Sequence, residues 1–139
     1  MEKIKVPSKV GIFICDPGGR LGSAIALDSV LQKLAKTKNV GRCEVIADIW
    51  SDKFQRSVIE DIKAGNLNRI LWVGRFSPNQ EKRIKAELAS AGLNPYLNEW
   101  CDLEEQGIGQ EGADRDIQTQ KATMLIQMSL FRTRLLEAL

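Results

Sequence analysis

The sequence predicts an α/β fold in which parallel β-strands alternate with helices. Four short apolar runs are separated by segments whose apolar residues follow a helical spacing, and capping residues mark the junctions. Strands that alternate with helices of about 10–15 residues are typical of βαβ units, whose right-handed crossovers build a parallel sheet. We therefore expect a single domain over residues 1–139, with a four-stranded parallel sheet and flanking helices.

The first expected strand covers residues 10–15 and the third covers residues 70–73. Both runs are almost continuously apolar and rich in branched or aromatic residues, which is typical of strands buried on both faces. The second and fourth strands are expected over residues 43–47 and 96–101.

A helix is expected after each of the first three strands. Apolar residues recur there at helical spacing, in stripes within residues 27–34, 54–62 and 84–91. The order of elements then reads βαβαβαβα once a helix after the fourth strand is added. This order is that of a Rossmann-like or flavodoxin-like fold.

Capping residues support two of these helices. Ser77 is the expected N-cap of the third helix, and Gln80 is its expected partner in a capping box. Ser51 or Asp52 can cap the second helix. Gly92 follows the third stripe as a C-terminal stop.

The last helix is expected over about residues 115–137, and it is long. Some 22 residues rise roughly 33 Å, which is more than a four-stranded sheet requires. We expect its apolar face to cover the sheet, with docking of the helix end on a partner as the alternative. That face comprises Met124, Leu125, Met128, Phe131 and Leu135.

The composition excludes several classes of protein. The 139 residues include no histidine, which removes the commonest general base and any His-ligated metal site. Three cysteines are an odd number and argue against a disulfide-stapled secreted fold. No apolar run approaches the roughly 18 residues of a membrane span, and no signal-peptide core follows the charged start, so a cytoplasmic location is expected.

The formal net charge of +2 conceals an acidic stretch. Residues 99–116 contain seven acidic groups and one basic group, so they carry −6 against +8 in the rest of the chain. Basic groups clustered with stacking aromatic residues are missing from the sequence, and nucleic-acid binding is therefore rejected.

A glycine-rich loop follows the first expected strand, at the place where α/β proteins bind phosphate groups. It departs from the dinucleotide pattern because Pro17 stands where the first glycine belongs, and from the Walker pattern because no Gly-Lys-Ser/Thr follows. One interpretation is a tight turn that needs positive φ. The other is a weak anion or nucleotide site, with Arg20 assisting, formed by Gly18, Gly19, Gly22 and Ser23.

The cysteines lack the spacing of a metal site. Cys15 and Cys101 end strands and Cys43 begins one, so buried, inert thiols are expected, with no metal and no cofactor. An enzyme built on Cys15 or Cys101 would lack a histidine base.

Three aromatic residues are expected at the carboxyl edge of the sheet. These residues are Trp50, Phe76 and Trp100, and each lies at or just after the end of a strand. Because this edge is aromatic and apolar, we expect a filled core or a contact surface there more than a catalytic cleft.

Four segments resemble the amino-terminal domain of the heterodisulfide reductase A-subunit, from residue 10 to about residue 136. Members of that family are flavin and iron–sulfur proteins of anaerobic electron-transfer complexes. The segments are Leu67-Asn-Arg-Ile-Leu, Phe76-Ser-Pro-x-x-Glu81, Ala91-Gly-Leu-Asn-Pro-Tyr-Leu97 and Glu105-Gln106.

The resemblance implies five cysteine positions, of which this chain retains only Cys15. The other four are occupied by Pro17, Trp50, Phe76 and Gly107. A [4Fe–4S] cluster generally needs four thiolates, so no cluster is expected. The sequence also lacks the flavin-binding fingerprint, so no flavin is expected either. Bulky Trp50 and Phe76 are expected to fill the space of the cluster.

The resemblance therefore implies a non-catalytic accessory or interaction subunit with a degenerate cluster site. Its expected partners are subunits of a heterodisulfide-reductase-like electron-transfer complex, and self-association stays open. The alternative is a small nucleotide- or anion-binding module that uses the loop at residues 18–23.

Overall fold

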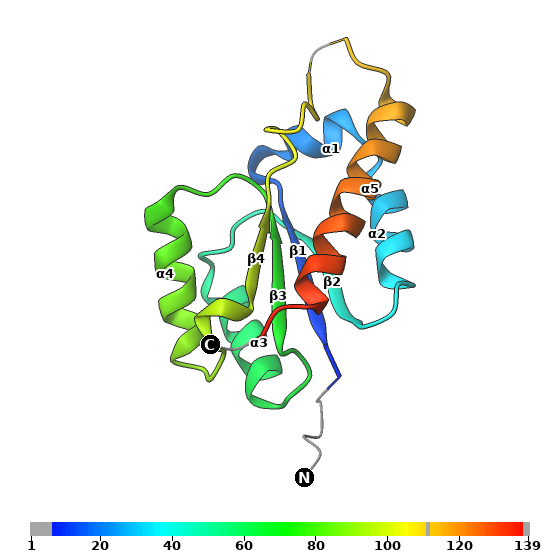
Figure 1. The fold of residues 1–139 in the computed structure, drawn as a ribbon. Coiled ribbons are helices and arrows are strands. Elements are labelled where there is room, and N and C mark those ends of the chain that lie inside the picture. Colours follow the sequence, from blue (N-terminus) through cyan, green and yellow to red (C-terminus); the bar gives the residue numbers. More distant parts are fainter. Residues whose placement is uncertain (1–6, 111, 138–139) are drawn as a thin grey trace.

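Four parallel strands form one sheet in the order β2-β1-β3-β4 (Figure 1). This computed structural model describes residues 7–110 and 112–137. Central β1 pairs with β2 on one side and β3 on the other, and Ile12 lies opposite both Cys43 and Leu71. The expected α/β class and parallel sheet are thus confirmed. The strands are β1 (Val10–Cys15), β2 (Val40–Ile46), β3 (Arg69–Val73) and β4 (Asn98–Cys101).

Helices cover both faces of the sheet (Figure 1). Two helices, α2 and α5, pack on one face, and α3 and α4 pack on the other. The α-helices are α1 (Arg20–Ala24), α2 (Leu27–Ala35), α3 (Asp52–Lys63), α4 (Pro78–Ala89) and α5 (Arg115–Arg134), and the 3-10 turns are η1 (Pro17–Gly19) and η2 (Pro95–Leu97). Within the described residues, no helix is long and apolar enough to cross a membrane.

The caps expected from the sequence are present. The Ser77 side chain accepts a hydrogen bond from the Gln80 N–H, and the Gln80 side chain accepts one from the Ser77 N–H, which completes the capping box. Ser51 caps α3 by accepting a hydrogen bond from the Phe54 N–H, so Asp52 is the first helical residue. Gly92 follows α4 with φ of 102°, a conformation that glycine adopts without strain.

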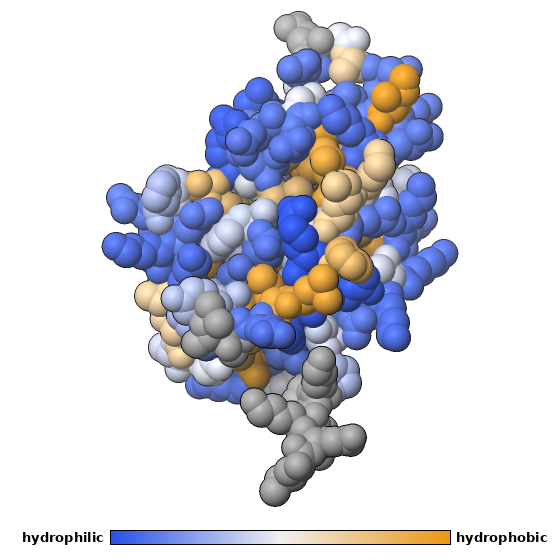
Figure 2. Space-filling model, viewed as in Figure 1, coloured by the Kyte–Doolittle hydropathy of each residue, from blue (hydrophilic) through white to orange (hydrophobic). Residues whose placement is uncertain are grey.

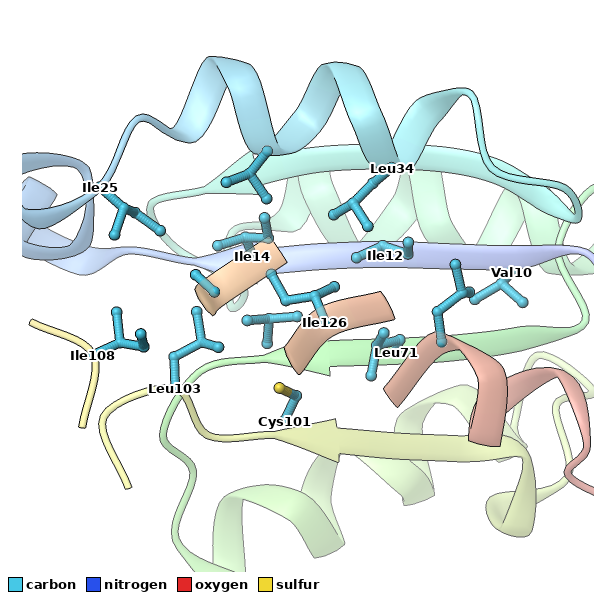
Figure 3. Close-up of a cluster of buried hydrophobic side chains, with 14 residues drawn as sticks. Val10, Ile12, Ile14, Ile25, Leu34, Leu71, Cys101, Leu103, Ile108 and Ile126 are labelled. Carbon is cyan, nitrogen blue, oxygen red and sulfur yellow. The ribbon is translucent and has the colours of Figure 1, made fainter. Parts of the chain in front are cut away.

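Each face of the sheet has its own apolar core, because side chains alternate along a strand. Ile12 and Ile14 of β1 pack toward α2 and α5, together with Ile126 (Figure 3). Phe13, between them, points to the other face and joins Trp72 under α3 and α4.

Two strands begin more than one residue away from the prediction. β2 begins at Val40 rather than at residue 43. β4 begins at Asn98 rather than at residue 96, because Pro95 and the Asn94 side chain, which accepts a hydrogen bond from the Tyr96 N–H, fix a 3-10 turn before the strand.

The prediction for the buried face of α5 is wrong. Met124, Met128, Phe131 and Leu135 are more than half exposed, and only Leu125 is half-buried. Small residues allow the helix to approach the sheet closely, and buried threonine hydroxyls donate to carbonyls one turn earlier. The buried face comprises Ala122, Thr123, Ile126, Ser129, Leu130 and Thr133.

Candidate functional site

A cleft of about 510 Å³ lies at the carboxyl edge of the sheet. The segment after each strand contributes to the cleft. The strand order reverses at the end of β1, because the chain continues from β1 to β2 on one side and later to β3 on the other. Ligands of open α/β sheets bind at such a switch point. The lining residues lie within 15–21, 47–50, 73–76 and 102–104, with Gln80.

The cleft brings together four of the residues singled out from the resemblance. Cys15, Pro17, Trp50 and Phe76 all line it, although they come from three separate segments of the chain. Gly107 does not line it. Of the loop at residues 18–23, only Arg20 and Leu21 contribute, so the predicted Gly18, Gly19, Gly22 and Ser23 lie outside the cleft.

Aromatic rings form a continuous cluster beneath one side of the cleft. Trp72 stacks on Trp100 with ring centroids 6.1 Å apart, and the edge of Phe76 meets Trp100 at 5.4 Å. The Arg83 guanidinium lies over Trp50, with its Cζ 4.1 Å from the centroid of the Trp50 ring. Trp50 and Phe76 line the cleft, and the space between them stays open.

The glycine loop is held by the carboxylate of Asp16. The N–H groups of Leu21 and Gly22 donate to its two oxygens at 2.8 and 2.9 Å. Gly18 and Gly19 have φ of 81° and 73°, so the expected positive-φ turn is present. A Cβ on Gly22 would lie 3.3 Å from Asp16 Oδ2, so this glycine permits the carboxylate to approach.

This arrangement weighs against an anion site in the loop. The amide groups at the start of a helix attract anions, but here the Asp16 carboxylate already accepts from two of them. Arg20, the expected helper, lies 3.8 Å from Glu104 instead.

Ion pairs close the far rim of the cleft. Arg75 Nε donates to Asp102 Oδ2 at 3.1 Å, and this hydrogen bond raises the pKa of the guanidinium. Glu104 lies 3.8 Å from both Arg75 and Arg20. Part of the acidic stretch is therefore paired with the basic body of the protein. Asp16, Asp48, Asp102 and Glu104 nevertheless outnumber the two arginines of the lining.

The three cysteines do not converge. Cys15 packs on the α3 and α4 face, whereas Cys43 and Cys101 lie on the α2 and α5 face, where Figure 3 shows Cys101 beside Leu103. Burial raises the pKa of Cys15 to about 12 and that of Cys43 to about 11, and it also raises the pKa of Cys101. Thiols with such pKa values stay protonated at neutral pH, whereas nucleophiles and metal ligands are thiolates.

The described residues contain no group of three or more His, Cys, Asp or Glu side chains that could hold a metal ion. A [4Fe–4S] cluster does not fit the cleft, because Cys15 is the only thiol in its lining.

Several cleft residues were not expected from the sequence. Asp16, Arg75, Asp102 and Glu104 each stand in a loop directly after a strand, which is the one signal that could have indicated them. Gly74 was also missed. It has φ of 156°, and a Cβ there would lie 3.1 Å from the Cys15 Cβ.

Known proteins resemble this chain over nearly its whole length, although no family model matches it. It is 32% identical over 139 residues to the A-subunit of the H2:CoB-CoM heterodisulfide,ferredoxin reductase of Methanothermobacter thermautotrophicus, and the match covers 99% of the chain. It is 31% identical over 132 residues, 94% of the chain, to the A-subunit of the ferredoxin/F420H2-dependent CoB-CoM heterodisulfide reductase of Methanosarcina acetivorans.

The chain is a distant homologue of the heterodisulfide reductase A-subunit. A third relative of this kind, the CoB–CoM heterodisulfide reductase iron–sulfur A-subunit 2 of Methanopyrus kandleri, is 29% identical over 132 residues, again 94% of the chain. The chain spans 16 to 21% of the length of these three heterodisulfide reductase proteins.

Proposed function

We propose that this chain is a non-catalytic accessory subunit, related to the amino-terminal domain of the heterodisulfide reductase A-subunit, that binds subunits of an anaerobic electron-transfer complex. The observation that supports it most is the make-up of the cleft. Cys15, Pro17, Trp50 and Phe76 share one cleft at the sheet edge, and three of these four lack a thiol.

The loss of the thiols favours a binding role over redox chemistry. The Methanopyrus kandleri relative is named as an iron–sulfur protein, whereas this cleft offers one thiol, and burial raises the pKa of that thiol to about 12. Aromatic walls and an open space between them are features of contact surfaces, where large rings supply area with few rotatable bonds.

The charge of the cleft indicates the chemistry of the partner segment. Its lining holds four carboxylates and two arginines, so it is net acidic. The arginines are paired with Asp102 and Glu104, whereas Asp16 and Asp48 accept only from backbone N–H groups and no lining cation balances their charge. A protein segment that places a basic side chain against the carboxylates and an apolar one against Trp50 would be complementary.

Purification of the tagged chain from its own cells under anaerobic conditions tests this proposal. We expect heterodisulfide-reductase-like subunits to co-purify with the wild type, and at least tenfold less with the double variant Trp50→Ala, Asp102→Lys. Tyr96→Ser is the matched control, because Tyr96 is exposed at the opposite end of β4 and touches no part of the cleft. Recovery of the chain alone, or equal recovery with all three proteins, contradicts the proposal.

Anaerobic incubation with iron and sulfide tests the degenerate cluster site separately. We expect no stoichiometric absorbance at about 400 nm, since one thiol cannot hold a [4Fe–4S] cluster. A stable chromophore would overturn this part of the proposal.

The alternative function, a nucleotide- or anion-binding module at Gly18–Ser23, is distinguished by thermal-shift measurements with nucleotides, flavins and phosphate. A saturable stabilisation that Arg20→Ala abolishes would favour it. Arg20 is a better target than Gly19, because Gly19 has φ of 73° and any larger residue there would strain the backbone whether or not the loop binds a ligand.

A further inference from the structure

The outer face of α5 carries an apolar stripe that the fold does not cover. Figure 2 shows it as a broken line of pale to deep orange side chains along this helix. The described part of the chain has six exposed large hydrophobic side chains, and all but Tyr96 belong to the stripe. They are Ile117, Met124, Met128, Phe131 and Leu135, with exposed fractions of 54 to 65%.

The spacing of the stripe is that of a helix–helix seam. Ile117, Met124 and Phe131 are seven residues apart, and so are Lys121, Met128 and Leu135. These two rows alternate at steps of three and four, as the a and d positions of a coiled coil do. The seam extends roughly 27 Å, given a rise of 1.5 Å per residue.

The charges at the two ends of α5 indicate what packs on this seam. Asp114 and Asp116 stand at its start with Arg115 between them, and Arg115 turns back to donate to the Ile25 carbonyl. Arg132 and Arg134 stand at its end, so the start is net acidic and the end is basic. An antiparallel copy of the same helix would place the acidic end of each against the basic end of the other. A parallel copy would place like charges together, which is unfavourable.

We propose that two copies of this chain form an antiparallel dimer through the outer face of α5. In the symmetric register, Met124 of each copy faces Met128 of the other, and Ile117 faces Leu135. A two-fold contact of this kind buries the same stripe on both chains and closes the assembly at two.

The dimer is expected to be weak and independent of the cleft. Five half-exposed side chains bury roughly 500 Å² per copy, below the about 800 Å² per partner of a standard interface, so a micromolar Kd is expected. The seam and the cleft share no residue, and the failure of either proposal would leave the other intact.

Sedimentation velocity of the purified chain from about 1 to 200 µM tests the dimer. We expect a concentration-dependent shift toward twice the 15.5 kDa mass of one chain. Met128→Glu should weaken dimerisation about 100-fold or more, because each dimer would then bury two carboxylates against apolar side chains. Tyr96→Glu, which adds the same charge at the other exposed large hydrophobic residue, is the control and should leave the Kd unchanged.

Cross-linking tests the orientation. Ile117→Cys and Leu135→Cys proteins, mixed and mildly oxidised, should link to each other and not to themselves, since each new thiol lies roughly 27 Å from its own counterpart in an antiparallel pair. A monomer at every concentration overturns the proposal, as does a dimer that Met128→Glu leaves intact. Self-linked products, or a helix of another protein on α5 in place of a second copy, overturn it too.

Discussion

Replacing Asp16 by alanine tests whether the glycine loop is held from inside the protein. The carboxylate is only 9% exposed and accepts hydrogen bonds from the Leu21 and Gly22 N–H groups. Alanine removes both acceptors and leaves two donors at the start of the five-residue α1 without a protein partner.

The expected cost is about 2–3 kcal/mol in the free energy of unfolding, because two charge-assisted bonds are lost at one helix start. Ser51→Ala is the matched control, since Ser51 caps α3 with a single hydroxyl and one hydrogen bond of 3.3 Å. Its expected cost is about 1 kcal/mol. Urea denaturation measures both free energies at the same protein concentration.

The same variant opens the loop to anions. With the carboxylate gone, the Leu21 and Gly22 amides are free to bind phosphate, so phosphate should stabilise Asp16→Ala more than it stabilises the wild type. A cost for Asp16→Ala no larger than that of Ser51→Ala would refute the reasoning, as would equal stabilisation of both proteins by phosphate.

Three further predictions concern the cleft and its floor. The variant P17C/W50C/F76C adds three thiols beside Cys15, and it should gain absorbance at about 400 nm after anaerobic incubation with iron and sulfide; a folded variant without it contradicts a degenerate cluster site. Gly74→Ala should destabilise the protein by about 2 kcal/mol or more in urea, because its Cβ would meet Cys15 at 3.1 Å; an unchanged midpoint contradicts this contact. Burial raises the pKa of Cys15 from 9.0 to about 12, so above pH 9 the folded protein retains a thiol proton that the unfolded chain loses. The contribution of this thiol to the free energy of unfolding is therefore complete below pH 9 and falls by about 1.4 kcal/mol per pH unit above it. Urea denaturation between pH 8 and about 10.5 should show a smaller loss for Cys15→Ala than for the wild type, and parallel curves would contradict the raised pKa.

Much of the fold can be predicted from the sequence because local signals and the buried surfaces agree. The run at residues 10–15 is a strand with the expected bounds, since it is apolar on both faces and lies at the centre of the sheet. The capping box at Ser77 fixes the start of α4 by hydrogen bonds between residues three apart. Such signals need no knowledge of distant contacts.

The candidate site could be predicted only in part. All strands of a parallel sheet end at the same edge, so the sequence could predict that Cys15, Trp50 and Phe76 lie near one another there. Their resemblance to cluster positions suggested a filled space, but whether two rings fill or merely border a space depends on their rotamers. Trp50 contacts Arg83 and Phe76 contacts Trp100, and both partners are distant in sequence.

The sequence by itself determined the order of strands and helices, because periodicity and capping are local properties of the chain. Only the tertiary structure decided which face of α5 is buried. The Met and Phe stripe is the more apolar face, but the sheet accepts the face with Ala122 and the two threonines, whose small side chains permit close packing and whose hydroxyls are satisfied within the helix. The stripe that hydropathy would assign to the core is therefore left on the surface, where a second chain can cover it.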